Sequence, residues 1–281
     1  MPSQADKAAQ FRKLHEEPGT FVIPNPWDAG SARVLAALGF KALATTSSGF
    51  AFSIARPDGA KAVSRDEVLA NARAIVAATD LPVSADLENC YADAPQAAAE
   101  TIALAAQAGL AGCSIEDFTG DRAQPIYDFE FALERVRAAV AAARALPGDF
   151  VLTARAENLI RGVDDLDDTI RRLQAFDEAG ADVLYAPGLN DLASVRAVVS
   201  SVSKPVNVLV SSGNAHFTHA QLAEAGVKRI SVGGALARAA AQAFIDAARA
   251  IAGHGDFRYA EGVVSLAELN ELLRQGAPRD D

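Results

Sequence analysis

Residues 83–91 read Val-Ser-Ala-Asp-Leu-Glu-Asn-Cys-Tyr, a short apolar run that ends in two carboxylates. The run is typical of a buried strand, in which residues i and i+2 point to the same face. Asp86 and Glu88 are therefore expected to project together from the end of this strand. Two neighbouring carboxylates repel each other, and a hard divalent cation such as Mg²⁺ commonly offsets that repulsion. The stretch thus predicts a metal site at the end of a buried strand.

Similar apolar segments recur along the whole chain and alternate with helical patterns. The expected strands are Phe21–Asn25, Lys41–Thr46, Val83–Glu88, Gly112–Glu116, Phe150–Arg155, Asp182–Ala186, Val206–Val210 and Arg229–Gly233. The helices expected between and after them are Ala29–Leu38, Arg65–Ala78, Ala94–Ala108, Glu130–Ala145, Asp165–Ala179, Leu192–Ser201, His219–Ala225 and Ala235–Ala252. Nearly continuous apolar strands indicate a parallel sheet that is covered on both faces. Eight βα units predict a TIM-type (β/α)₈ barrel, with a doubly wound open sheet as the alternative.

We expect one domain, with the barrel at about residues 18–253. A helix at about Gln4–His15 precedes the barrel, and an extension over residues 254–281 follows it, with a helix from Ser265. No G-x-G-x-x-G motif follows the first strand, so dinucleotide binding has no support from the sequence.

Composition excludes several classes of partner. The chain of 281 residues is 50% hydrophobic and carries a formal net charge of −10, with a pI near 4.9. Nucleic acids and anionic membrane surfaces need basic patches, so neither is an expected partner. We expect neither a signal peptide nor a membrane-spanning segment. Cys90 and Cys113 fit no disulfide framework or zinc spacing, which favours a reducing compartment such as the cytoplasm.

Polar residues gather at the C-terminal ends of the expected strands, where barrel active sites form. They are Asn25, Asp28, Thr45, Thr46, Ser47, Ser48, Asp86, Glu88, Glu116, Asp117, Arg155, Glu157 and Asn207. Asp86 is the expected direct Mg²⁺ ligand, with Glu88 and Glu116 bound directly or through water. For any one of these acids, a helix cap or a pair with an arginine is the alternative interpretation.

Further candidates lie next to this set. The turn Ser47-Ser48-Gly49-Phe50 could bring backbone N–H groups close to a ligand oxygen, although it could also be an ordinary βα turn. Arg155 could bind a carboxylate through two hydrogen bonds, or form a structural ion pair. Cys90 has no neighbouring histidine in the sequence, and we expect it to be non-catalytic. The histidines are expected to be peripheral or in loops; they are His15, His216, His219 and His254.

Over about residues 18–253, several motifs in order resemble the isocitrate lyase/phosphoenolpyruvate mutase superfamily. They are the segment from Gly39 to Ser48-Gly49, then Arg56-Pro57-Asp58-Gly59, Ser84–Tyr91, Ser114-Ile115-Glu116-Asp117 and Thr153-Ala154-Arg155-Ala156-Glu157. The resemblance implies a (β/α)₈ barrel that assembles as a dimer or tetramer and swaps its last barrel helix between subunits. It also implies Mg²⁺ or Mn²⁺ as cofactor and a small anionic 2-oxo acid as substrate.

The same resemblance implies roles for particular residues. Asp86, Glu88 and Glu116 surround the metal, and Arg155 holds a substrate carboxylate. The catalytic candidates are Asp58, Tyr91, Glu116 and Arg155, with Asp58 or Tyr91 transferring the proton. The substrate-binding candidates are Thr46, Ser48, Gly49, Phe50, Arg155 and Asn207.

Three departures from the superfamily pattern narrow the function. Its lyases carry a Cys-Gly-His loop where this chain reads Phe-Thr-Gly-Asp-Arg-Ala-Gln-Pro at residues 118–125, so the acid for isocitrate-type cleavage is missing. The metal signature usually ends in Gly-Tyr-Gly or Gly-Phe-Gly, but Cys90 and Ala92 flank Tyr91 here. The sixth strand ends in Tyr185, where relatives often place His or Glu.

We therefore expect a Mg²⁺-dependent lyase that cleaves a C–C bond in a small 2-oxo or 2-hydroxy (di)carboxylic acid through an enolate, as in oxaloacetate decarboxylation. One alternative is a phosphonomutase-type enzyme acting on phosphoenolpyruvate or carboxyphosphonoenolpyruvate. The alternative from another class is a barrel that binds an oxo acid without turnover.

Overall fold

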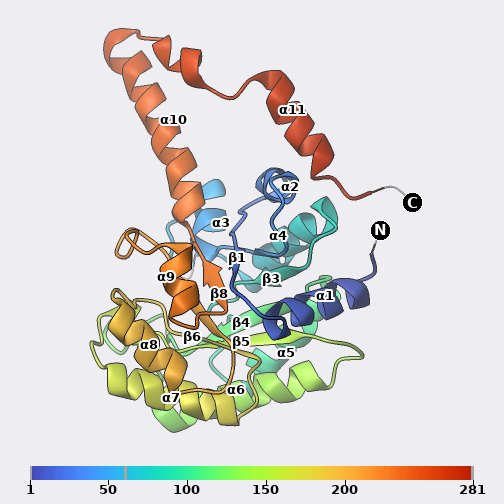
Figure 1. Ribbon diagram of the computed structural model, residues 1–281, viewed down its shortest axis with the longest axis vertical. Helices are drawn as coiled ribbons and strands as arrows, with labels where there is room; N and C mark the ends of the chain where they lie inside the picture. The colour runs from blue at the N-terminus through green and yellow to red at the C-terminus, as the bar shows by residue number, and fades with distance from the viewer. Residues whose placement is uncertain (1, 60–61, 280–281) are drawn as a thin grey trace.

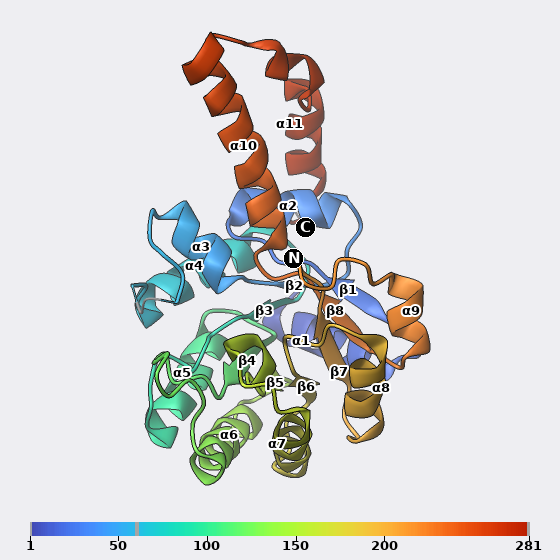
Figure 2. The same ribbon diagram turned by 90° about the vertical axis from the view of Figure 1, so that its left-hand side faces the viewer.

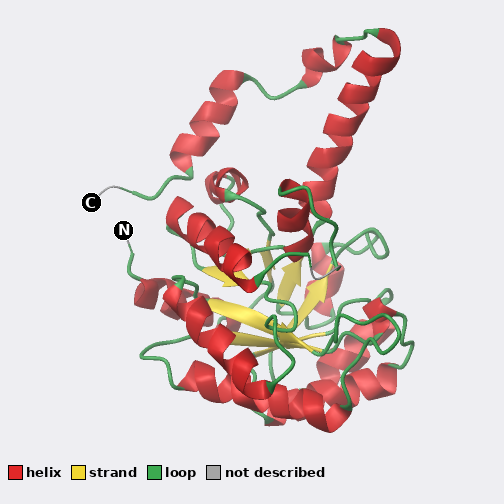
Figure 3. Cartoon of the chain, turned by 180° about the vertical axis from the view of Figure 1, so that it is seen from behind, coloured by secondary structure: helices red, strands yellow, loops and turns green. Residues whose placement is uncertain are grey.

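Eight parallel strands form the centre of the protein, in the order β1-β8-β7-β6-β5-β4-β3-β2. The computed structural model describes residues 2–59 and 62–279. The strands are β1 (Phe21–Ile23), β2 (Leu43–Ala44), β3 (Val83–Ala85), β4 (Gly112–Glu116), β5 (Val151–Arg155), β6 (Val183–Tyr185), β7 (Val206–Leu209) and β8 (Arg229–Ser231). Figure 1 and Figure 3 show the helices arranged around them. The predicted barrel is confirmed.

The helices follow the strands in the alternating order expected from the sequence. They are α1 (Gln4–Glu16), α2 (Ala29–Ala37), α3 (Ser47–Ser53), α4 (Arg65–Ala78), α5 (Pro95–Gln107), α6 (Phe129–Arg144), α7 (Leu166–Glu178), α8 (Leu192–Ser200), α9 (His219–Glu224), α10 (Ala235–His254) and α11 (Leu266–Gln275), with short 3₁₀ turns at Leu159–Arg161 and Arg258–Gly262. A capping box starts α4, because Ser64 and Glu67 exchange side chain–backbone hydrogen bonds.

Asn25, just after β1, links the first and last strands to the second. Its amide nitrogen donates to the carbonyl of Thr45, and its amide oxygen accepts from the backbone N–H groups of Val232 and Gly233. Ala44 also donates its N–H to the carbonyl of Pro24 across the β1–β2 seam, at 3.1 Å. These bonds bring the two ends of the sheet together into a nearly closed barrel.

Helix α1 covers the N-terminal end of the barrel. Phe11 is fully buried there among small and branched residues that lie in the strands or directly before them; these are Ile23, Ala42, Ala111, Val151 and Val183. His15, one turn after Phe11, is buried as well, with 8% of its surface exposed. The expectation of a peripheral His15 is therefore wrong, because the helical period places it on the same buried face as Phe11.

Two local predictions need correction. The strand at residues 83–88 ends at Ala85, so Asp86 and Glu88 do not share a strand face. The expected turn at residues 47–50 is the first part of helix α3, which Thr46 caps by accepting a hydrogen bond from the N–H of Gly49 at 3.2 Å. Both errors arise where the chain leaves the sheet, since side-chain hydrogen bonds rather than strand periodicity set the backbone there.

The C-terminal helices project away from the barrel (Figure 1, Figure 2). Helix α10 contains no buried residue, and its Phe244 is 73% exposed. The helix predicted from Ser265 is α11, with Ser265 as its N-cap. The chain then returns toward the barrel, so that Gly276 lies against the backbone of Arg33 in α2. Among the described residues, no helix is both long and apolar enough to cross a membrane.

Candidate active site

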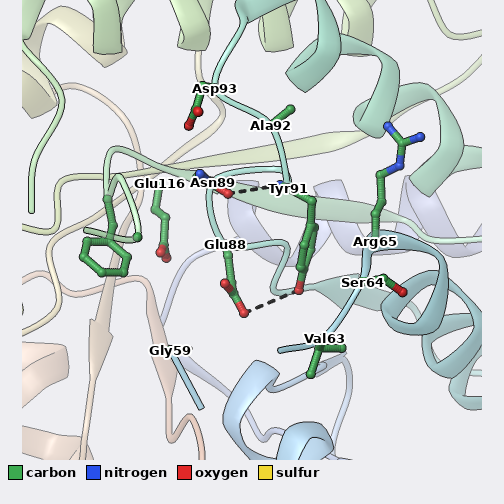
Figure 4. A pocket seen from close by; sticks show the side chains of 12 residues that line it. Gly59, Val63, Ser64, Arg65, Glu88, Asn89, Tyr91, Ala92, Asp93 and Glu116 are labelled. Atoms are coloured by element: carbon green, nitrogen blue, oxygen red, sulfur yellow. Dashed lines mark hydrogen bonds between the residues drawn. The ribbon is translucent and has the colours of Figure 1, made fainter. Parts of the chain in front are cut away.

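Two neighbouring cavities lie at the C-terminal end of the barrel. The central cavity has a volume of about 250 Å³, and the predicted residues that line it are Thr46, Ser48, Asp58, Asp86, Arg155 and Asn207. The side cavity has a volume of about 280 Å³, and Glu88, Tyr91 and Glu116 line it (Figure 4). Both are smaller than the roughly 300–1,000 Å³ typical of sites for drug-sized ligands, which favours a small substrate.

Arg155, the last residue of β5, forms the centre of the charged cluster. Its guanidinium contacts Asp86 Oδ1 at 2.9 Å, Glu116 Oε2 at 3.1 Å and Glu157 Oε1 at 2.7 Å. The ring of Tyr185 lies beneath it, with the guanidinium carbon 4.8 Å from the ring centroid. Register explains the arrangement, because Glu116 of β4 and Tyr185 of β6 are the direct strand neighbours of Arg155. The arginine is thus already bonded to three carboxylates.

Asp86 is held in place by hydrogen bonds with the segment that follows β2. Its Oδ2 accepts from the Ser47 hydroxyl at 3.0 Å, and its backbone N–H donates to the Thr45 hydroxyl at 3.0 Å. Its other oxygen faces Arg155. The most strongly expected ligand therefore has a fixed orientation toward the central cavity.

Burial and the nearness of other carboxylates raise the pKa values of Glu88, Asp58 and Glu116. Burial, and then the charges of Asp86 and Asp58, raise the pKa of Glu88 to about 7. Burial and Asp86 also raise the pKa of Asp58. Burial, with Glu157 next, raises the pKa of Glu116 well above its usual range. A bound divalent cation would counter the repulsion between these carboxylates and keep the Glu88 carboxylate ionised.

Glu88 and Tyr91 stand side by side in a tight turn (Figure 4). The Tyr91 hydroxyl donates to Glu88 Oε1 at 3.4 Å. Glu88, Cys90 and Tyr91 all have positive φ angles, of 48°, 61° and 56°. This turn, and not the strand, directs the two side chains into the side cavity.

The predicted substrate contacts from α3 differ in position. Thr46 and Ser48 line the central cavity, whereas Phe50 packs against the hydrophobic core. Gly49 is buried, and a Cβ there would lie 2.7 Å from Thr46 Cγ2 and 3.0 Å from Trp27 Cβ. Glycine at this position therefore allows α3 to approach Trp27, and its N–H is already used by the cap.

Sequence reasoning missed the contribution of Arg161, in the 3₁₀ turn after β5. Its guanidinium contacts Glu157 Oε2 at 3.0 Å and Glu116 Oε1 at 3.4 Å, and lies 3.6 Å from the centroid of Phe118. The signal was present, because Arg161 follows Glu157 at the i+4 spacing that favours an ion pair. Arg161 and Phe118 also line a further cavity beside Asp58.

A second missed arginine lies deeper in the barrel. Within the described residues, all hydrogen-bond partners of Arg229 are neutral groups. They are Asn207 Oδ1 at 2.8 Å, Thr153 Oγ1 at 3.0 Å and His15 Nε2 at 3.2 Å. Burial lowers its pKa to about 10, with the charge of Arg155 adding to the effect. Asn207, predicted to bind substrate, lines the central cavity but is bonded to Arg229 and to the Ser231 hydroxyl.

The acids suit a hard divalent cation by their chemistry. Oxygen donors in a buried, mutually repelling group are what Mg²⁺ or Mn²⁺ would stabilise. Within residues 2–59 and 62–279, however, no three His, Cys, Asp or Glu side chains converge as a ready metal cluster. Arg155 lies between Asp86, Glu116 and Glu157 instead. The arrangement therefore fits a hydrated ion held by one or two carboxylates, with Asp86 and Glu88 as the candidates.

Comparison with known proteins identifies the relatives of this chain. The phosphoenolpyruvate phosphomutase family profile matches residues 11–252. A crystal structure of a protein assigned as a lyase/mutase from Burkholderia cenocepacia J2315 has a TM-score of 0.92 and 53% identity, covering 95% of both chains. The uncharacterized protein Rv1998c of Mycobacterium tuberculosis (strain ATCC 25618 / H37Rv) is 36% identical over 94% of this chain and 95% of its own length.

Oxaloacetate decarboxylase of Pseudomonas aeruginosa (strain LESB58) is 30% identical over 88% of this chain and 86% of its own length. These matches span the barrel and the strand ends described above, and they confirm the resemblance seen in the sequence motifs. The chain belongs to the phosphoenolpyruvate mutase family and is an enzyme of the isocitrate lyase/phosphoenolpyruvate mutase superfamily.

Proposed function

We propose that this enzyme is a divalent-metal-dependent lyase that breaks a C–C bond in a small 2-oxo or 2-hydroxy acid, with decarboxylation of an oxaloacetate-like acid as its reaction. The observation that carries the proposal is the cluster around Arg155, where Asp86, Glu116 and Glu157 contact one buried guanidinium beside the central cavity. The 30% identity to an oxaloacetate decarboxylase supports the same reaction class.

Each residue has a proposed part in substrate binding. Arg155 receives the substrate's 2-oxo carboxylate, since a guanidinium can bind a carboxylate through two parallel N–H groups. This requires Asp86 to share or release its contact with Arg155. Asp86 and Glu88 would hold Mg²⁺ or Mn²⁺, which supplies Lewis-acid stabilisation of the negative charge that develops on substrate oxygens. Ser48 and Thr46 face the same cavity and offer hydroxyl donors.

Decarboxylation of such an acid breaks the bond between C3 and the departing carboxylate. The electron pair of that bond enters the enolate of the 2-oxo acid, CO₂ leaves, and a proton must then reach C3. The Tyr91 hydroxyl, which is hydrogen-bonded to Glu88, can deliver it, and Asp58 is the second candidate. No cysteine acid is required, which agrees with the loop at residues 118–125 and with the complete burial of Cys90 and Cys113.

We also propose a single-domain enzyme that works as a dimer or tetramer in a reducing compartment such as the cytoplasm. Exposed apolar side chains on α10 support association with a second copy of this chain, which would cover them. They include Leu236, Phe244, Ile245 and Ile251. Phe244→Glu is expected to lower the sedimentation mass of the protein. A wild-type protein that sediments as a monomer would contradict the proposed assembly.

A turnover screen in which NMR detects the products tests the proposed reaction. Oxaloacetate, its 3-substituted homologues, methylisocitrate, isocitrate and phosphonopyruvate are each incubated with enzyme in Mg²⁺ and in EDTA. Pyruvate or a homologue that forms only with Mg²⁺ supports the lyase. Turnover of phosphonopyruvate alone would replace it by the phosphonomutase alternative, and saturable binding of an oxo acid without product at high enzyme concentration would replace it by the non-catalytic barrel.

A further inference from the structure

The turn at residues 88–93 has an unusual backbone for its sequence. Glu88, Cys90 and Tyr91 adopt φ angles between 48° and 61°, in the left-handed region that L-residues with a side chain avoid. Such a conformation persists only where surrounding contacts impose it, and it is commonly found at functional sites. Because Glu88 and Tyr91 line the side cavity, whatever holds this turn also fixes the candidate site.

Bonds within the turn hold it only in part. The Cys90 N–H donates to the Leu87 carbonyl at 2.7 Å, and the Tyr91 N–H donates to Asn89 Oδ1 at 3.1 Å. From outside, the Glu116 N–H donates to the Glu88 carbonyl at 3.0 Å, and the Thr101 hydroxyl donates to the Cys90 carbonyl at 2.8 Å. The carbonyls of Asn89, Ala92 and Asp93 take none of these bonds and accept from helix α6 instead.

Arg135 of α6 supplies the donors for those carbonyls. Its Nε donates to the carbonyl of Asp93 at 3.0 Å, and its Nη2 donates to the carbonyls of Ala92, at 2.9 Å, and Asn89. The side chain is 99% buried, since 1% of its surface is exposed. A buried guanidinium normally pairs with a carboxylate. In the described part of the chain, the bonds that Arg135 donates go to backbone carbonyls of this one turn.

Tyr127 completes the support. Its ring lies 4.4 Å from the guanidinium carbon of Arg135, and its hydroxyl bonds with Asp93 and accepts from Asn89 Nδ2 at 3.1 Å. Arg135 and Tyr127 therefore both bond with Asn89 and Asp93, at the two ends of the turn. The arginine is also costly to bury, and its Nη1 lacks a hydrogen-bond partner among the described residues.

We propose that Arg135 is a positioning residue of the candidate site, which holds the turn at residues 88–93 in its left-handed conformation and so fixes Glu88 and Tyr91. Three neighbouring carbonyls bound by one planar group define the path of the chain more tightly than any single bond would. The expected effect of Arg135 on turnover rests on the proposed function. Its effect on the conformation of the turn does not depend on that function.

Hydrogen–deuterium exchange tests the holding of the turn without any substrate. In Arg135→Met, amides of residues 88–93 are expected to exchange about tenfold faster or more, while those of β5 and β6, which make no bond with the turn within residues 62–279, stay within about twofold of wild type. Arg135→Lys retains a donor and should give an intermediate rate, and it carries the test if Arg135→Met does not fold. Arg137→Met removes an exposed arginine from the same helix and should match wild type.

Turnover supplies the second measurement. For the acid that the wild type converts, Arg135→Met should lower kcat by about tenfold or more and change KM less, since Arg155 lies outside the turn. Unchanged exchange in the turn, an equal rise across all strands, or a loosened turn with unchanged kcat would each overturn the proposal. If the wild type converts none of the acids, the proposed function fails, while the exchange rates still decide whether Arg135 holds the turn.

Discussion

Acidification should destabilise this protein through one buried histidine, His15. Arg229 can only donate, so His15 Nε2 accepts from it, and Nδ1 carries the proton that is donated to the Phe11 carbonyl at 2.8 Å. Burial, and next the charge of Arg229, lower the pKa of His15 from 6.5 to about 3. Lys228 and Arg12 add smaller effects in the same direction. The folded protein therefore holds the neutral imidazole, whereas the unfolded chain takes up a proton below pH 6.5.

The magnitude follows from that difference in pKa. The stability that the neutral His15 contributes is fully present above pH 6.5 and is lost progressively as the pH falls toward about 3. At pH 5 the loss relative to pH 7.5 is about 2 kcal/mol, since each pH unit below the unfolded pKa is worth about 1.4 kcal/mol. Asp117 acts in the opposite direction, because burial raises its pKa to about 6.

Urea unfolding of the wild type and of His15→Gln at pH 7.5, 6.5, 5.5 and 5 isolates this effect, because Asp117 and all other acids are common to both proteins. His15→Gln is expected to be the less stable protein at pH 7.5, and the difference should shrink by about 2 kcal/mol by pH 5. A difference in the free energy of unfolding that does not change with pH would refute the buried, neutral His15 and its bond with Arg229.

Three other substitutions test separate parts of the structure. Arg172→Met should lower the free energy of unfolding by about 3 kcal/mol in urea, because it leaves the buried Asp117 without its ion pair at 3.1 Å. Gly234→Ala should reduce kcat/KM by about tenfold at nearly unchanged melting temperature, because the added Cβ collides with the Ser48 hydroxyl and displaces it. Cys90→Ala should keep kcat within about twofold of wild type, since burial raises the pKa of this thiol to about 12 and removes it from proton transfer.

Each of these has a result that contradicts the reasoning. A wild-type urea midpoint for Arg172→Met would mean that its ion pairs add no stability. Full activity of Gly234→Ala would place Ser48 outside substrate binding, and loss of activity in folded Cys90→Ala would make this cysteine a catalytic group.

The barrel itself was predictable because its signals are local. Alternating apolar segments and helices, and caps such as Ser64 with Glu67, depend on residues a few positions apart. The acids at the strand ends were also predictable as a group, because parallel strands in a barrel place their C-terminal ends at one rim. Asp86, Glu116 and Glu157 accordingly meet at Arg155.

What the sequence did not reveal depends on contacts between distant segments. The turn that carries Glu88 is bonded by residues that lie well beyond it in the sequence, Thr101, Glu116 and Arg135, and no local pattern predicts three left-handed residues without glycine. The hydrogen bond that fixes the tautomer of His15 comes from Arg229, 214 positions later in the sequence. The position of Arg155 among three acids, rather than beside an open metal cluster, likewise follows from strand register.

The measurement that tests the central claim most directly is the initial rate of decarboxylation in Mg²⁺, compared between wild type, Asp86→Asn and Asp167→Asn. Asp167 is an exposed acid in the first turn of α7 and serves as the matched control. We expect wild type and Asp167→Asn to form a pyruvate-type product, and EDTA to abolish its formation. In folded Asp86→Asn the rate should fall by a factor of about 100 or more. Equal rates in all three proteins, or a rate that EDTA leaves unchanged, would contradict a metal-dependent lyase centred on Asp86.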